Sequence, residues 1–132
     1  MTKVDLSHCS YLVVDDDEFQ RDLVTAVLER IGGSRIFCAS DSDSACKLAQ
    51  QHKPDFVLLD IYMPQVDGFA MLDQLRRIHP ALVVIMVTGS HTPADFGKSL
   101  DRRVDGFCIK PVLPDIMLKT LTNARTRRLA QP

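Results

Sequence analysis

The chain has four cysteines, but none of them is spaced as a zinc-binding or redox pair would be. They are Cys9, Cys38, Cys46 and Cys108. Zinc sites and redox pairs usually place two cysteines roughly two to four residues apart. This absence argues against a zinc site, and we expect buried free thiols in a reducing cytosol.

The sequence also lacks a signal peptide and any run of about 18 apolar residues, the length that a membrane span needs. It has no excess of one charge, since the formal net charge is -1 and acidic and basic residues are interspersed. The protein therefore has no overall positive electrostatic field that would attract an anionic membrane or nucleic acid. We expect a cytoplasmic protein that neither meets a membrane nor binds nucleic acid directly, and that selects its partners through a local surface.

The 132 residues, 45% of them hydrophobic and 25% charged, are enough for one domain with one core. We place this domain at residues 1–124. Residues 125–132 contain three arginines and are expected to form a solvated basic tail or the start of a linker to an output domain.

Short apolar runs alternate five times with segments of helical periodicity. The predicted strands are 11–14, 35–39, 55–59, 82–87 and 107–109, and the predicted helices are 19–31, 41–49, 69–78, 93–104 and 114–124. Such alternation indicates a doubly wound α/β fold, in which helices cover both faces of a five-stranded parallel sheet in three α/β/α layers.

Two of the predicted helices have a buried face that we assign from apolar spacing. For the first helix the assigned residues are Phe19, Leu23, Ala26, Val27 and Ile31, and for the last they are Ile116, Met117, Leu118, Leu121 and Ala124. The first helix also needs an N-cap. We assign that cap to Asp17 and reserve Asp15 and Asp16 for a metal site.

Polar residues directly follow four of the predicted strands. Asp15 and Asp16 follow the first strand, Asp60 the third, Thr88 the fourth and Lys110 the fifth. The carboxyl ends of parallel strands share one edge, so these side chains are expected to converge there. Three carboxylates at one place need a cation, and their hard oxygen ligands suit Mg²⁺.

A carboxylate nucleophile, a metal, an ammonium and a hydroxyl around one point are a sufficient set for phosphoryl transfer. We choose Asp60 as the nucleophile because it stands alone after the central strand, whereas Asp15 and Asp16 are adjacent and better suited to a metal. Thr88 and Lys110 would each bind a phosphoryl oxygen.

These motifs, in this order, resemble the response-regulator receiver family of two-component signalling over nearly the whole chain. They are Val13–Asp17, Leu58–Pro64, Asp67–Gly68, Val87–Gly89 and Lys110–Pro111. The resemblance implies a flavodoxin-like fold with strand order 2-1-3-4-5. It further implies that Asp60 accepts a phosphoryl group from a histidine kinase or a histidine phosphotransfer protein.

The resemblance also implies roles for single residues. Asp16, Asp60 and the backbone carbonyl of Tyr62 would ligate Mg²⁺, with Mn²⁺ as an alternative, while Asp15 would hold a metal-bound water. The Lys110–Pro111 peptide would be cis.

The resemblance implies an output as well. Thr88 and Phe107 would form the switch. The output surface would consist of the fourth and fifth helices and the fifth strand, and would meet an output domain, a target protein or a second copy of the chain after phosphorylation. Such a chain is not an enzyme in the usual sense, because it only phosphorylates and dephosphorylates itself.

Two alternatives remain. The haloacid-dehalogenase-type phosphatases use a similar order of residues, which Asp15, Asp17, Thr88 and Lys110 imitate, but that reading leaves Asp60 unexplained and lacks a later acidic motif. A pseudo-receiver would use the fold only to bind a partner, and the complete acidic set argues against it.

Overall fold

The computed structural model describes residues 5–63, 66–89, 94, 97–98 and 102–130. Its strands are β1 (Ser10–Val14), β2 (Arg35–Ala39), β3 (Phe56–Leu59), β4 (Tyr62–Met63), β5 (Val66–Asp67), β6 (Val83–Thr88) and β7 (Gly106–Ile109). Its helices are η1 (Leu6–His8), α1 (Glu18–Arg30), α2 (Ser42–His52), α3 (Gly68–Ile78) and α5 (Pro114–Ala130).

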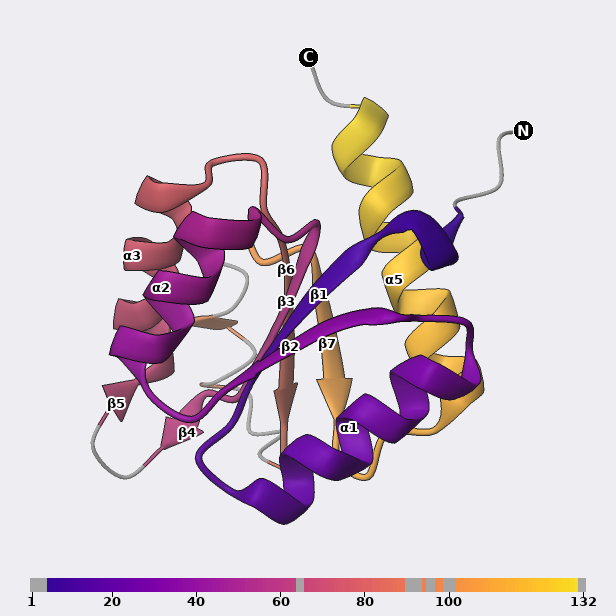
Figure 1. The fold of residues 1–132 in the computed structure, drawn as a ribbon, viewed down its shortest axis with the longest axis horizontal. Coiled ribbons are helices and arrows are strands. Elements are labelled where there is room, and N and C mark those ends of the chain that lie inside the picture. Colours follow the sequence, from indigo (N-terminus) through magenta and orange to yellow (C-terminus); the bar gives the residue numbers. More distant parts are fainter. Residues whose placement is uncertain (1–4, 64–65, 90–93, 95–96, 99–101, 131–132) are drawn as a thin grey trace.

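Five parallel strands form the central sheet in the order β2-β1-β3-β6-β7. Since β6 and β7 are the fourth and fifth predicted strands, the predicted order 2-1-3-4-5 is confirmed. Helices α2 and α3 cover one face of this sheet, and α1 and α5 cover the other (Figure 1). The small antiparallel pair of β4 and β5 was not predicted.

The core has two halves, one on each face of the sheet. Along β1, Leu12 and Val14 belong to the half under α2 and α3, whereas Tyr11 and Val13 belong to the half under α1 and α5. All four side chains are buried. Side chains alternate between the faces of a strand, so a strand covered on both faces must be apolar throughout. This requirement explains the continuous apolar runs.

Helix α1 begins as predicted, because the Asp17 carboxylate accepts hydrogen bonds from the backbone amides of Phe19 and Gln20. Its predicted buried face is confirmed only in part, since Val27 and Ile31 pack partly buried against the core. Phe19 is 66% exposed and Leu23 44% exposed, while Val24 and Leu28 face the core. The face that meets the sheet is therefore turned toward Val24 and Leu28, which the apolar spacing alone did not show.

Helix α5 is longer than predicted and runs to Ala130. Met117, Leu121 and Ala124 are buried as predicted, whereas Ile116 and Leu118 are exposed. The arginines at its end are not a solvated tail. The side chains of Arg125 and Arg128 are 24% and 23% exposed and pair with Asp55 and Asp105 respectively.

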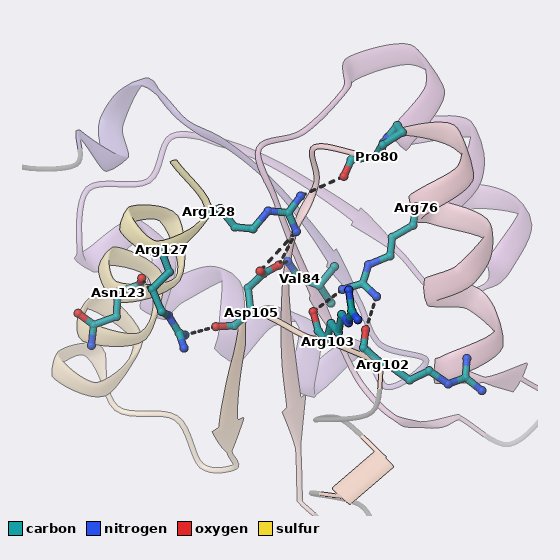
Figure 2. Close-up of polar contacts among 9 residues, drawn as sticks. All are labelled: Arg76, Pro80, Val84, Arg102, Arg103, Asp105, Asn123, Arg127 and Arg128. Carbon is teal, nitrogen blue, oxygen red and sulfur yellow. Dashed lines mark hydrogen bonds and ion pairs between the residues drawn. The ribbon is translucent and has the colours of Figure 1, made fainter. Parts of the chain in front are cut away.

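Asp105 is the centre of the polar contacts at the amino end of β7 (Figure 2). Its carboxylate accepts hydrogen bonds from Arg128 and from the backbone amide of Val84, and its carbonyl accepts from Arg127. Arg128 also reaches the carbonyl of Pro80. These bonds attach the last turns of α5 to the loops that precede β6 and β7.

In the same close-up, Arg76 of α3 donates hydrogen bonds to the backbone carbonyls of Arg102 and Arg103 (Figure 2). Half of the predicted helix 93–104 lies outside the described residues; Ala94 and 97–98 are helical, whereas 102–104 are not. Val104, its last residue, packs against the core half under α2 and α3. Within the part of the chain that is described, no helix has the length and apolarity to cross a membrane.

Asp55 joins the start of the sheet to α5. Its carboxylate accepts from the Ser10 amide at 2.8 Å and from the Arg125 guanidinium at 3.0 Å. Burial alone would raise its pKa, but these bonds hold the pKa of Asp55 below its ordinary value. The stabilisation is therefore present above the ordinary carboxyl pKa and is lost as the pH falls through the lower folded pKa.

We accordingly expect Asp55→Asn to lower the free energy of unfolding by about 1 kcal/mol at pH 7. The gap between variant and wild type should narrow as the pH falls below about 4, where Asp55 gains its proton in the unfolded chain before it does so in the folded one. Urea unfolding between pH 7 and pH 3 measures both values, with the exposed Asp22→Asn on α1 as the control. A gap that stays constant with pH would contradict this role.

Candidate functional site

The strand ends predicted to converge lie at one edge of the sheet. Val14 at the end of β1 pairs in register with Leu59 at the end of β3, and Thr88 of β6 pairs with Ile109 of β7. The residue that directly follows β1, β3 and β7 is polar in each case. Asp15, Asp60 and Lys110 thus emerge side by side at the carboxyl edge.

Three carboxylates meet at this edge. Asp15, Asp16 and Asp60 each offer an oxygen atom, and these atoms all lie within 4.8 Å of one another. Asp15 and Asp60 are buried, with exposed fractions of 3% and 8%, whereas Asp16 is exposed. Charges of one sign at this spacing repel, so the arrangement favours any cation that enters it.

Lys110 supplies one positive charge. Its Nζ lies 2.6 Å from Oδ2 of Asp15 and 3.3 Å from Oδ2 of Asp60. Burial alone would lower the pKa of Lys110, but the two carboxylates hold it above its ordinary value. The side chain therefore remains an ammonium at neutral pH and can pair with an anion beside Asp60.

Backbone contacts fix the strand ends around these groups. The Asp60 amide donates to the Val14 carbonyl, and the Lys110 amide donates to the Thr88 carbonyl. The Lys110–Pro111 peptide is cis, as predicted. Thr88 is buried at the end of β6, so the predicted hydroxyl is placed at the same edge as the carboxylates.

Helix α3 begins very close to the Asp60 backbone. Gly68 is buried, its amide donates to the Ile61 carbonyl, and an added β-carbon would lie 2.7 Å from the Asp60 carbonyl oxygen. Real β-carbons do not come that close to a backbone atom. In the sequence, Asp67–Gly68 was only one of the motifs behind the resemblance, and it gave no sign of this contact.

Two further predicted residues have a known position but an untested role. Tyr62 lies in β4, two residues after Asp60, and its backbone carbonyl remains a predicted ligand. Phe107 lies in β7 and packs partly buried against the core half under α2 and α3. Sequence reasoning missed Arg21 of α1, whose Nη1 donates to the Asp15 carbonyl at 2.7 Å.

The carboxylate group fits a small divalent cation. Mg²⁺ binds oxygen at about 2.1 Å, so ligand oxygens on opposite sides of it are about 4.2 Å apart. The three oxygens, which all lie within 4.8 Å of one another, are close to that span. Donors that are all carboxylate oxygens suit Mg²⁺ or Mn²⁺ and not softer metals.

Comparison with known proteins agrees with this geometry. The response regulator receiver domain family matches residues 11–122. The chain belongs to this family. It is 32% identical over 122 residues to the alkaline phosphatase synthesis transcriptional regulatory protein PhoP of Bacillus subtilis, a match that covers 92% of this chain and 50% of that protein.

A second relative is the response regulator Rre1 of Synechocystis, 33% identical over 123 residues, with 92% of this receiver and 53% of Rre1 covered. The receiver therefore spans about half the length of these relatives. Among solved structures, a response regulator of Burkholderia pseudomallei with a phosphorylated aspartic acid, a calcium ion and citrate superposes with a TM-score of 0.78 and 26% identity, covering 92% of this chain and 71% of that one.

Proposed function

We propose that this receiver accepts a phosphoryl group on Asp60 from a histidine kinase or a histidine phosphotransfer protein. The observation that carries the proposal is the position of Asp60. It follows the central strand β3, belongs to the three-carboxylate group and lies 3.3 Å from the Lys110 ammonium. The phosphorylated aspartic acid of the similar Burkholderia pseudomallei structure supports this assignment.

In the transfer, an Asp60 carboxylate oxygen forms the new bond to phosphorus. The bond between phosphorus and the donor nitrogen breaks, and the donor histidine keeps that electron pair. Lys110 is placed to pair with a phosphoryl oxygen as negative charge gathers there, and Thr88 would donate its hydroxyl hydrogen to another.

Mg²⁺, or Mn²⁺ in its place, would be held by Asp16, Asp60 and the Tyr62 carbonyl, with Asp15 on a metal-bound water. When bound, it neutralises phosphoryl charge and aligns the donor. Asp15 is suited to an indirect role, because its Oδ2 is bonded to Lys110 and its Oδ1 accepts from the Asp17 amide.

The output would be a protein contact. Thr88 and Phe107 would switch together. Apolar side chains are exposed at Ile109 of β7, at Leu113 just before α5 and at Ile116 of α5. The relatives are about twice as long as this receiver, which supports an output domain joined after α5. A separate target protein or a phosphorylation-linked homodimer would use the same surface.

The proposal predicts that wild type incubated with Mg²⁺ and acetyl phosphate gains one labile phosphoryl group and that Asp60→Asn gains none. The amide of Asn is not a nucleophile, yet it keeps the shape of the side chain. Intact-protein mass spectrometry measures the adduct. Asp43→Asn, at an exposed residue of α2, is a control that should be phosphorylated like wild type.

Other results would favour the alternatives. An adduct that survives in Asp60→Asn but is lost in Asp15→Asn would indicate a phosphatase of the haloacid-dehalogenase type. No adduct on wild type, together with no binding of beryllofluoride, would indicate a pseudo-receiver.

A further inference from the structure

Arg21 makes a contact with the carboxylate turn that the proposed chemistry does not use. It lies in the first turns of α1, partly buried, and its guanidinium Nη1 donates to the backbone carbonyl oxygen of Asp15 at 2.7 Å. That carbonyl comes just after the end of β1. The side chain therefore crosses from the helix to the strand end at the edge of the site.

This bond fixes more than one atom. The peptide bond is planar, so the Asp15 carbonyl oxygen and the nitrogen and α-carbon of Asp16 lie in one plane. The Asp15 amide is already bonded to the Ala39 carbonyl, and the Asp15 carboxylate to the Asp17 amide. With Arg21 on the carbonyl, the peptide between Asp15 and Asp16 is held on both sides.

Asp16 is the carboxylate that most needs such support. Asp15 and Asp60 are buried and contact Lys110, whereas Asp16 is exposed and lies on the turn between β1 and α1. A ligand is placed reproducibly only when the groups behind it are fixed. The backbone under Asp16 must therefore supply the order that burial supplies for the other two.

We propose that Arg21 is a positioning residue that holds the Asp15–Asp16 peptide and so aims the Asp16 carboxylate at the cation. The inference rests on the proposed function, because it assumes that the carboxylate group binds Mg²⁺. Arg21 itself touches neither the metal nor the phosphoryl group.

Charge and geometry predict opposite effects of removing this arginine. A guanidinium beside three carboxylates repels an incoming cation, so a purely electrostatic role means that its loss tightens Mg²⁺ binding. Loss of a positioning contact instead weakens binding, typically by 10- to 100-fold for residues behind the metal ligands. The sign of the change therefore separates the two roles.

The test compares wild type, Arg21→Met and Arg30→Met by calorimetric titration with MgCl₂ at constant ionic strength. Met keeps the apolar stem in both variants, and Arg30 is exposed at the far end of the same helix. We expect about tenfold weaker Mg²⁺ binding in Arg21→Met and wild-type affinity in Arg30→Met. Urea unfolding without metal reports whether the variants are folded.

Unchanged or tighter Mg²⁺ binding in a folded Arg21→Met would overturn the positioning role and leave the proposed function intact. Wild type that does not bind Mg²⁺ would instead overturn the metal site itself. If Arg21→Met does not fold, Arg21→Lys takes its place, since Lys keeps the charge but not the guanidinium geometry. A smaller loss of affinity is then expected, and wild-type affinity would refute the proposal.

Discussion

Gly68→Ala is expected to lower the free energy of unfolding by about 2 to 3 kcal/mol and to slow phosphorylation of Asp60. The new β-carbon would lie 2.7 Å from the Asp60 carbonyl oxygen and 2.8 Å from the α-carbon of Ile61. Both are backbone atoms, so no side-chain rotation relieves the contact. Either helix α3 or the Asp60–Ile61 backbone must shift, and a shift of that backbone displaces the nucleophile.

Urea unfolding and the initial rate of acetyl phosphate labelling measure these two effects. Gly97→Ala is the matched control, because a β-carbon there meets nothing within 4 Å. Its free energy of unfolding should stay within about 0.5 kcal/mol of wild type or rise, since Ala favours a helix more than Gly does. Wild-type stability and labelling in Gly68→Ala would show that α3 can shift without cost.

Lys110→Met is expected to lower the free energy of unfolding by about 3 kcal/mol in the absence of divalent cations. The variant leaves Asp15 and Asp60, both buried, without the ammonium that now lies 2.6 Å and 3.3 Å from their oxygens. Mg²⁺ would supply charge of the same sign to the same group of carboxylates. The loss should therefore be much smaller in excess MgCl₂, while labelling of Asp60 stays slow.

Urea unfolding of wild type and Lys110→Met, each with and without MgCl₂, gives the four free energies of unfolding that the comparison needs. Lys119→Met, at an exposed position of α5, is the control and should change stability by less than about 0.5 kcal/mol. An equal loss with and without Mg²⁺ would mean that Lys110 stabilises the fold by packing and not by offsetting the carboxylates.

The sheet was predictable because its strands are short apolar runs that alternate with helical segments, and four of the five lead into a polar residue of the site. In β3, for example, Phe56–Leu59 is buried on both faces and Asp60 follows. Continuous apolar runs of this kind are typical of strands in a parallel sheet that is covered on both faces. The pair β4 and β5 was missed because strands of two residues have no periodicity to detect.

Helix faces were harder to predict. In α1, Phe19 and Leu23 form an apolar stripe as convincing as the one that contains Val24 and Leu28, and only packing against the sheet decides between them. The end of α5 was missed because Arg128 looked like a solvated charge. Its partner Asp105 is 23 residues away in sequence, and local pattern does not reveal such a pair.

The predicted carboxylates and Lys110 lie together, because strand ends carry them and the sheet order is regular. What the sequence could not show is the backbone support behind them. The contact of Arg21 with the Asp15 carbonyl and the close approach of Gly68 to Asp60 both involve main-chain atoms, which have no residue-type signature.

The arginines near Asp105 lie at the amino edge of the sheet, and their position also affects the electrostatic field around the molecule. Arg76, Arg127 and Arg128 lie at that edge, and the three carboxylates lie at the opposite one. A net charge of -1 does not reveal that these two groups of opposite charge lie at opposite edges. A positively charged surface would be attracted to the carboxylate group, and salt screens such an attraction beyond a Debye length of about 8 Å.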